Sequence, residues 1–144
     1  MILKNKLIIY SLVLGFFGFL DSLYLTISHY KNIVPPCTIH GCETVLTSSF
    51  SMIGPVPLAL FGVLFYLTII IVSLLIVVEG RKQLLKFFHF TVLVGFLFSV
   101  MLFLIQALII KSFCQYCLLS EVIATGLLFL SLLKLKQDRA IKPD

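Results

Sequence analysis

Two pairs of cysteines are the residues of this chain best suited to do chemistry. Cys114 and Cys117 lie three residues apart in "SFCQYCLLS", at the edge of a long apolar run. Cys37 and Cys42 lie in an earlier segment, with four residues between them. Cysteines three apart share one face of a helix and form or break a disulfide with little backbone movement. The two pairs therefore predict thiol–disulfide exchange.

The Cys-x-x-Cys pair is predicted to occupy the first turn of a helix. Unpaired amides and the positive end of the helix dipole lower the pKa of a thiol there, and Lys111 is close by in the sequence. A stabilised thiolate at the edge of an apolar segment is a good electron donor to a carrier dissolved in lipid. The two-electron carrier that diffuses in membranes is quinone, so quinone is the expected acceptor.

The loop pair favours exchange over a structural role. A disulfide between Cys37 and Cys42 closes a very small loop, so it constrains few conformations of the unfolded chain. Two alternatives remain open. Both pairs are structural disulfides in the first, and all four cysteines bind zinc in the second. An oxidising exterior and the spacing of the loop pair disfavour zinc, so no metal is expected.

The elements that must position these cysteines are membrane helices. The chain has 144 residues, of which 60% are hydrophobic and 12% charged, too few charges to cover a soluble domain. Each of four apolar stretches has about 20 residues or more, enough at about 1.5 Å per residue to cross a hydrocarbon core of about 30 Å. They cover residues 6–28, 57–78, 87–110 and 113–133. A cleaved signal peptide is disfavoured because no small-residue cleavage site follows the first stretch.

The basic residues predict the orientation of the helices. Nine of the eleven lie before the first helix, between the second and third, or after the fourth, which places both termini in the cytoplasm. These nine are Lys4, Lys6, Arg81, Lys82, Lys86, Lys134, Lys136, Arg139 and Lys142. Only Lys31 and Lys111 fall on the other side, with all four cysteines, where disulfides persist. The net charge of +5 thus follows from topology and requires no nucleic-acid partner.

The first outer loop, residues 29–56, is long enough to suggest a function. Its first half, residues 29–41, contains Pro35 and Pro36 and is predicted to be irregular and mobile. From Cys42 to Ile53 the apolar residues approximate helical spacing, which predicts a short amphipathic helix on the outer surface. The predicted fold is an all-α membrane protein over residues 1–144, a four-transmembrane-helix bundle with this short helix in the first outer loop.

Polar residues inside the apolar stretches are candidates for function. A carboxylate at the centre of a membrane helix costs about 2.5–3.5 kcal/mol, and less near the interface. Asp21 is expected to tune a thiol or a proton, or else to reach interfacial water; Gln106 is open to the same two readings. Glu121 follows Cys117 by one turn and is better placed to take a proton.

The combined spacing resembles the vitamin K epoxide reductase family, in particular its bacterial members. The resemblance rests on Cys-x-x-Cys opening the fourth helix, a cysteine pair in the first outer loop, and Ser48 six residues beyond Cys42. The segments "DSLYLTISHY" and "GPVPLALFGVLFY" are similar to the family too, and the resemblance covers about residues 10–130. The chain departs from the vertebrate enzymes at Glu121, where they have tyrosine, which favours simple quinone reduction over reduction of an epoxide.

The resemblance implies a role for each candidate residue. Cys114 and Cys117 form the quinone-side centre, Cys37 and Cys42 form the shuttle, and Ser48 hydrogen-bonds in the quinone region. Aromatic residues near the outer end are expected to wall the quinone pocket, namely Phe61, Phe113 and Tyr116.

The expected function is that of a membrane thiol oxidase of the bacterial inner membrane. It would reoxidise a separate thioredoxin-like protein on the outer face, because the chain ends at Asp144 without such a domain. It would pass the electrons to menaquinone or ubiquinone. The alternative is a non-catalytic membrane subunit or assembly factor whose cysteines form structural disulfides.

Overall fold

Four long helices dominate the structure, a computed structural model that describes residues 5–141. Each is long and apolar enough to cross a membrane, which confirms the predicted all-α four-helix fold. They are α1 (Lys6–Tyr30), α3 (Leu58–Glu79), α4 (Lys82–Leu104), continued by the π-helical turn η3 (Ile105–Ile110), and α5 (Gln115–Ile141).

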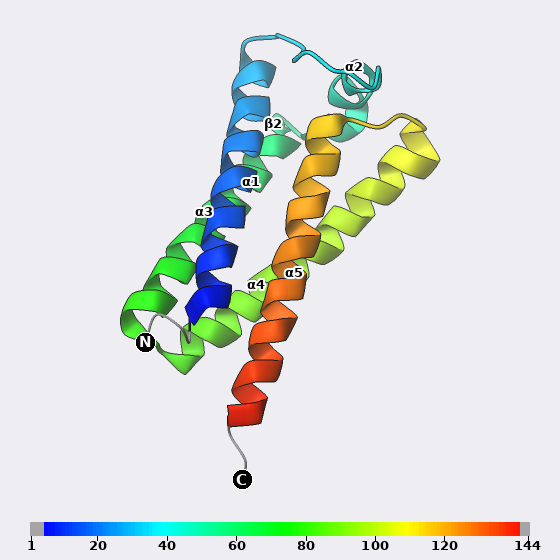
Figure 1. Cartoon of the computed structure of the whole chain (residues 1–144). Helices are drawn as coiled ribbons and strands as arrows, with labels where there is room; N and C mark the ends of the chain where they lie inside the picture. The colour runs from blue at the N-terminus through cyan, green and yellow to red at the C-terminus, as the bar shows by residue number, and fades with distance from the viewer. Residues whose placement is uncertain (1–4, 142–144) are drawn as a thin grey trace.

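The helices pack in a ring. Helix α1 packs against both α3 and α5. Helix α4 completes the ring because it packs against α5 and α3. The start of α1 and the end of α5 lie at the same end of the bundle (Figure 1). The loop after α1 and the connection between α4 and α5 lie together at the opposite end. All four cysteines are therefore at one end of the bundle.

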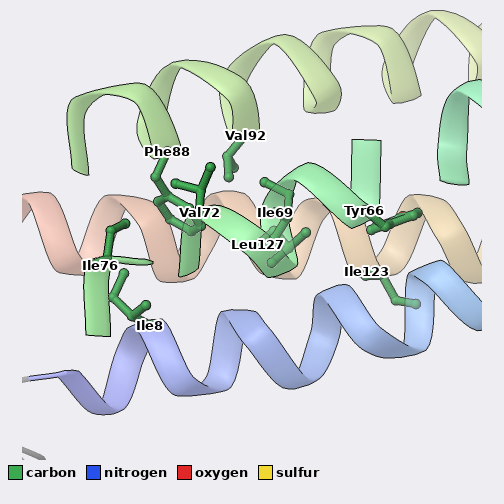
Figure 2. Close-up of a cluster of buried hydrophobic side chains, with 9 residues drawn as sticks. All are labelled: Ile8, Tyr66, Ile69, Val72, Ile76, Phe88, Val92, Ile123 and Leu127. Atoms are coloured by element: carbon green, nitrogen blue, oxygen red, sulfur yellow. The ribbon is translucent and has the colours of Figure 1, made fainter. Parts of the chain in front are cut away.

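A compact apolar core joins the helices in the half of the bundle away from the cysteines (Figure 2). Ile8 of α1, Ile76 of α3 and Phe88 of α4 mark its far end, and Tyr66 and Ile123 mark the end nearer the cysteines. Between them lie Ile69, Val72, Val92 and Leu127. This core fixes the helices relative to one another, so the other half of the bundle can contain a cavity.

Large apolar side chains also cover the outside of the bundle. Val78 is 81% exposed, and Leu108 and Val122 are each 68% exposed. Such exposure of apolar surface would be unfavourable in water, but it is the normal arrangement of a helix whose outer face contacts lipid. The surface thus agrees with the hydropathy of the four helices.

The amphipathic helix in the first loop is shorter than predicted. Helix α2 covers only Cys42–Leu46, followed by a 3₁₀ turn η2 (Ser49–Ser51) and a small hairpin of β1 (Met52–Ile53) and β2 (Val56–Pro57). The hydroxyl groups of Thr47 and Ser48 donate to the carbonyls of Glu43 and Val45. Such bonds compete with continued helix, which explains why α2 ends before Phe50.

Two helices extend beyond their apolar stretches. The observed α4 begins at Lys82, five residues before the predicted start at 87, and α5 continues from 133 to Ile141. The extension of α5 contains an ion pair of Lys134 and Asp138, 3.3 Å apart at i and i+4. The basic residues of these extensions lie at the end of the bundle away from the cysteines, as predicted; Lys4 and Lys142 lie outside the described residues.

Candidate redox site

Cys37 and Cys42 are joined by a disulfide that lies at the outer edge of the cysteine end of the bundle. Cys42 is fully buried, whereas Cys37 is half-buried. Both line a hollow of about 260 Å³, together with Val34, Pro35, His40 and Glu43. A thiol that enters this hollow meets the Cys37 sulfur more easily than the Cys42 sulfur.

Cys114 and Cys117 are free thiols at the start of α5. Cys114 is the N-cap of the helix, whereas the sequence placed it inside the first turn, and its carbonyl accepts the N–H of Leu118 at 2.9 Å. It is completely buried and packs in one cluster with Cys42 and Val45. The fold therefore brings one cysteine of the loop pair against one cysteine of the helix pair.

The position of Cys114 favours its thiolate. The hydrogen bond from the side chain of Cys117 lowers the pKa of Cys114 most, burial opposes it, and the backbone N–H groups of Cys117 and Tyr116 lower it further. The result is a pKa of about 7, down from 9.0. These amides belong to the first turn of α5 and have no partner within the helix, so the predicted effect of the helix start applies to Cys114.

The two residues between Cys114 and Cys117 hold the segment around Cys37. The Oε1 atom of Gln115 accepts the backbone N–H and the hydroxyl of Thr38, at 3.1 and 2.6 Å. The hydroxyl of Tyr116 donates to the carbonyl of Pro36 at 2.7 Å. The first half of the loop is irregular, as predicted, but these bonds attach it to α5. Sequence reasoning missed Gln115, since nothing in the chain pairs it with a residue 77 positions away.

Gly41 permits the close approach of Cys42 to Cys114. A Cβ atom added to Gly41 would overlap the carbonyl oxygen of Phe113. The φ of Gly41 is −124°, which any residue adopts, so glycine is needed here for space alone. The ring of Phe113 points instead toward Phe103, with the ring centroids 5.9 Å apart.

We expect Gly41→Ala to move the loop away from α5 and slow exchange between Cys42 and Cys114. A displacement of about 1 Å costs an oriented reaction about 10²-fold in rate. The measurement is the rate at which Cys42 and Cys114 form a disulfide, with oxidised glutathione as the oxidant, in a protein without Cys37 and Cys117. Gly54→Asn is the control, because Gly54 has open space around it and asparagine accepts its positive φ of 61°. Equal rates in both variants would show that the Gly41 contact does not position Cys42.

A cavity of about 1010 Å³ lies beneath the loop and extends along α4 as far as Phe87 and Phe90 near the start of that helix. Cys117 lines it, whereas Cys114 and the loop pair do not. Of the other predicted site residues, Asp21, Ser48, Phe61 and Glu121 line the cavity. Phe113 and Tyr116 do not, because their side chains face Phe103 and the loop. Cys117 and both acidic residues are therefore accessible from the same cavity.

The polar groups of the cavity have different surroundings. Asp21 is 9% exposed, and its Oδ2 atom has no hydrogen-bond partner among the described residues. Glu121 accepts a hydrogen bond of 2.9 Å from the side chain of Gln106. The hydroxyl of Ser48 donates to Val45, so its remaining lone pairs are free to accept. The sequence left the role of Gln106 open. The only sign of a function was that it is a lone polar residue inside an apolar membrane helix.

The arrangement has the features of an electron relay. Cys37 lies at the outer surface, Cys42 packs with Cys114, and Cys117 reaches a mainly apolar cavity. Two of the four sulfurs are joined in a disulfide, so a four-thiolate zinc site cannot form in this state.

Comparison with known proteins agrees with this arrangement. A search of curated proteins finds no match. A family model described as "Vitamin K epoxide reductase family" matches residues 9–132, which include all four cysteines and the cavity. The match also agrees with the resemblance carried by the cysteine spacing. The chain belongs to the vitamin K epoxide reductase family, and it is accordingly a membrane oxidoreductase of disulfide chemistry.

Proposed function

We propose that the protein is a membrane thiol oxidase that takes electrons from a thioredoxin-like partner and passes them to quinone. The observation that supports the proposal most is that the cysteines lie in order from the outer hollow to the cavity. Cys42 is buried against Cys114, and Cys117 lines the cavity. Two separate structural disulfides would need no such contact, and Cys114 and Cys117 are not joined in this structure.

The first exchange takes place at the outer hollow. A thiolate of the reduced partner attacks Cys37, the disulfide with Cys42 breaks, and a mixed disulfide of Cys37 and the partner forms. The second thiol of the partner then attacks its own sulfur in that bond. The partner leaves with an internal disulfide, and Cys37 and Cys42 are left as thiols.

The second exchange moves the electrons inward. With Cys114 and Cys117 joined as a disulfide, the Cys42 thiolate attacks Cys114 and releases Cys117 as a thiolate. Cys37 then attacks Cys42, which restores the loop disulfide and frees Cys114. The product has a disulfide in the loop and two thiols at α5, which is the state that the structure shows.

The cavity is suited to quinone as the electron acceptor. Its volume of about 1010 Å³ is at the upper end of the range typical of small-molecule sites, and its lining is mainly apolar, with aromatic rings such as Phe61 and Phe65. Polar groups lie near Cys117, among them Glu121 on the same face of α5 and Asp21 on α1. A quinone ring with polar oxygens on an apolar frame matches such a lining.

The last exchange reduces the quinone and restores the disulfide between Cys114 and Cys117. Two electrons leave the thiols as this S–S bond forms, and the quinone takes them with two protons to give a hydroquinone. Cys117 contacts the quinone and adds to its ring. The Cys114 thiolate, whose pKa is low, then attacks the Cys117 sulfur, so the S–S bond forms as the bond from Cys117 to the quinone breaks and hydroquinone leaves. We assign proton supply to Asp21 and Glu121, and we assign Ser48 to a hydrogen bond with a quinone oxygen. The quinone is either menaquinone or ubiquinone, dissolved in the membrane lipid.

The proposed location is the bacterial inner membrane, with both termini in the cytoplasm. The support is the distribution of the described basic residues, most of which lie at the end of the bundle opposite the cysteines, whereas Lys31 and Lys111 lie at the cysteine end. This orientation places the loop disulfide outside, where a thioredoxin-like partner needs reoxidation.

The rate of quinone-driven disulfide formation should depend on pH through Cys114. Folding lowers the pKa of this thiol to about 7, so the reactive thiolate is lost below that pH and nearly complete above about pH 8. We expect the rate to rise about tenfold from pH 6 to pH 8 and then to level off. Stopped-flow mixing of the reduced protein with a soluble quinone measures it. A rate that still rises tenfold from pH 8 to pH 9 would mean that the Cys114 thiol is not activated.

Replacing Cys114 distinguishes the relay from the alternative of a structural protein. Because Cys114 is a free thiol in this structure, Cys114→Ala is expected to leave the amount of protein in the membrane unchanged within about twofold while activity is lost. Both quantities are measured on the same membranes, by immunoblot and by quinone reduction. A protein that stays active, or that becomes scarce without Cys114, favours the structural alternative.

A further inference from the structure

The π-helical turn η3, which continues α4 at its outer end, contains a buried amide that the relay itself does not use. Gln106 is only 4% exposed, although Leu108 and Ile109, two and three residues further on, are 68% and 58% exposed. A buried amide inside a membrane helix is unfavourable unless its donors and acceptors are paired. Its partners therefore indicate why it is there.

The backbone around Gln106 departs from the regular α-helix. The turn η3 (Ile105–Ile110) is π-helical and ends at Lys111, whose φ is +54°. The carbonyl of Gln106 accepts the N–H groups of Lys111 and Ser112. Single π-helical turns change the direction in which side chains point, and they occur often at functional sites. The same residue thus holds the start of the connection that leads to Cys114.

The side chain of Gln106 pairs at both of its ends. Its Oε1 atom accepts the backbone N–H of Cys114 at 3.1 Å, and its Nε2 atom donates to Oε1 of Glu121 at 2.9 Å. A backbone N–H can only donate, so the amide oxygen must face Cys114 and the amide nitrogen must face Glu121. One side chain therefore links the buried redox cysteine to an acidic residue of the cavity.

We propose that Gln106 is a positioning residue that holds Cys114 against Cys42 and at the same time orients Glu121 toward the cavity. Cys114 lies between two fixed neighbours, the loop on one side and α5 on the other, and Gln106 fixes its backbone from α4. This inference rests on the proposed relay, because it gives the contact of Cys42 and Cys114 its function. In this proposal, Cys114 and the cavity residue Glu121 belong to one hydrogen-bonded unit that is joined by Gln106.

The first test measures the position of Cys114 without partner or quinone. The protein for this test carries Cys37→Ser and Cys117→Ser. It is equilibrated with reduced and oxidised glutathione, and the fraction with a Cys42–Cys114 disulfide is determined on non-reducing gels. We expect Gln106→Met to weaken this disulfide about fivefold to tenfold, the effect of one lost hydrogen bond. The control is Ser99→Ala on the same helix, which should change it by less than about twofold. An equal effect of both variants would overturn the proposal.

The second test uses the two ends of the amide separately. Gln106→Glu keeps an acceptor for the Cys114 N–H but places two acidic side chains together, so the disulfide should again weaken severalfold. Adding Glu121→Gln exchanges the two side chains, so that the amide at position 121 donates to the carboxylate at position 106. We expect the equilibrium to return to within about twofold of the starting protein. If the exchanged pair does not recover, Gln106 has no positioning role through Glu121. A failure of quinone reduction with a normal outcome here would instead count against the proposed function alone.

Discussion

Cys42→Ser is expected to abolish turnover and to leave Cys37 able to form a stable bond with the thiol-donating partner. Cys42 is the buried member of the loop pair and packs with Cys114, so no other loop sulfur can pass electrons inward. Cys37 remains at the outer hollow, where a partner thiol can reach it. Loss of a residue that forms a covalent intermediate lowers turnover by on the order of 10³-fold or more.

The trapped bond can be formed in a defined reaction. The partner is prepared with one active-site cysteine, carried as a mixed disulfide with thionitrobenzoate. The Cys37 thiolate attacks it, a bond between Cys37 and the partner forms, and coloured thionitrobenzoate is released in equal amount. The matched variant Cys37→Ser should give little of this product. When it starts with Cys114 and Cys117 joined as a disulfide, Cys42 attacks Cys114 and releases Cys117, so the internal Cys42–Cys114 bond should accumulate. A partner linked directly to Cys114 or Cys117 would show that the loop pair is not the shuttle.

Cys117→Ser should separate the two inner steps. Cys117 is the cysteine that lines the cavity, so reduction of quinone should fall on the order of 10³-fold or more without it. Cys114 keeps its place beside Cys42, and the bond between these two should still form. The variant therefore cannot pass electrons to quinone, but its Cys42 and Cys114 can still form a disulfide with each other.

Two measurements on one preparation check this result. Quinone reduction is followed by absorbance with a reduced partner, and the Cys42–Cys114 bond is mapped by peptide mass after mild oxidation. Ser120→Ala is a control of similar depth, since Ser120 lines the cavity but contains no sulfur. Rapid quinone reduction by Cys117→Ser would mean that Cys114 contacts the acceptor directly, against the arrangement described.

Much of the fold follows from chemistry that is local in the sequence. The four apolar runs predict the helices, because only a helix satisfies its own backbone in lipid, and the Cys-x-x-Cys at 114–117 marks the start of α5 to within one residue. The helix ends were less accurate, since apolar composition marks the hydrocarbon core and not the end of the helix. Lys82 extends α4 as an exposed residue at the polar boundary, where a long basic side chain is stable, whereas Lys134 is buried on α5 and pairs with Asp138.

The details of the site depend on contacts between distant residues. Glu121 could be placed on the face of Cys117 from its spacing, because residues four apart on a helix share a face. Tyr116 and Phe113 were expected at the cavity, but the direction of each side chain depends on how the loop packs on α5, through Pro36 and Gly41. The bond of Gln106 with the N–H of Cys114 also requires the π-helical turn, which no residue pattern in the chain predicts.

In the proposed relay, thiols outside the bundle and quinone inside it exchange electrons through four cysteines. The most direct measurement uses the purified protein in lipid vesicles, with a reduced thioredoxin-fold protein and a quinone as the only other reactants. We predict that one quinone is reduced for each disulfide formed in the partner, because both reactions transfer two electrons. We also predict that this reaction stops when Cys37, Cys42, Cys114 or Cys117 is replaced. Quinone reduction at an unchanged rate after loss of all four cysteines, or no reduction by the intact protein, would contradict the account.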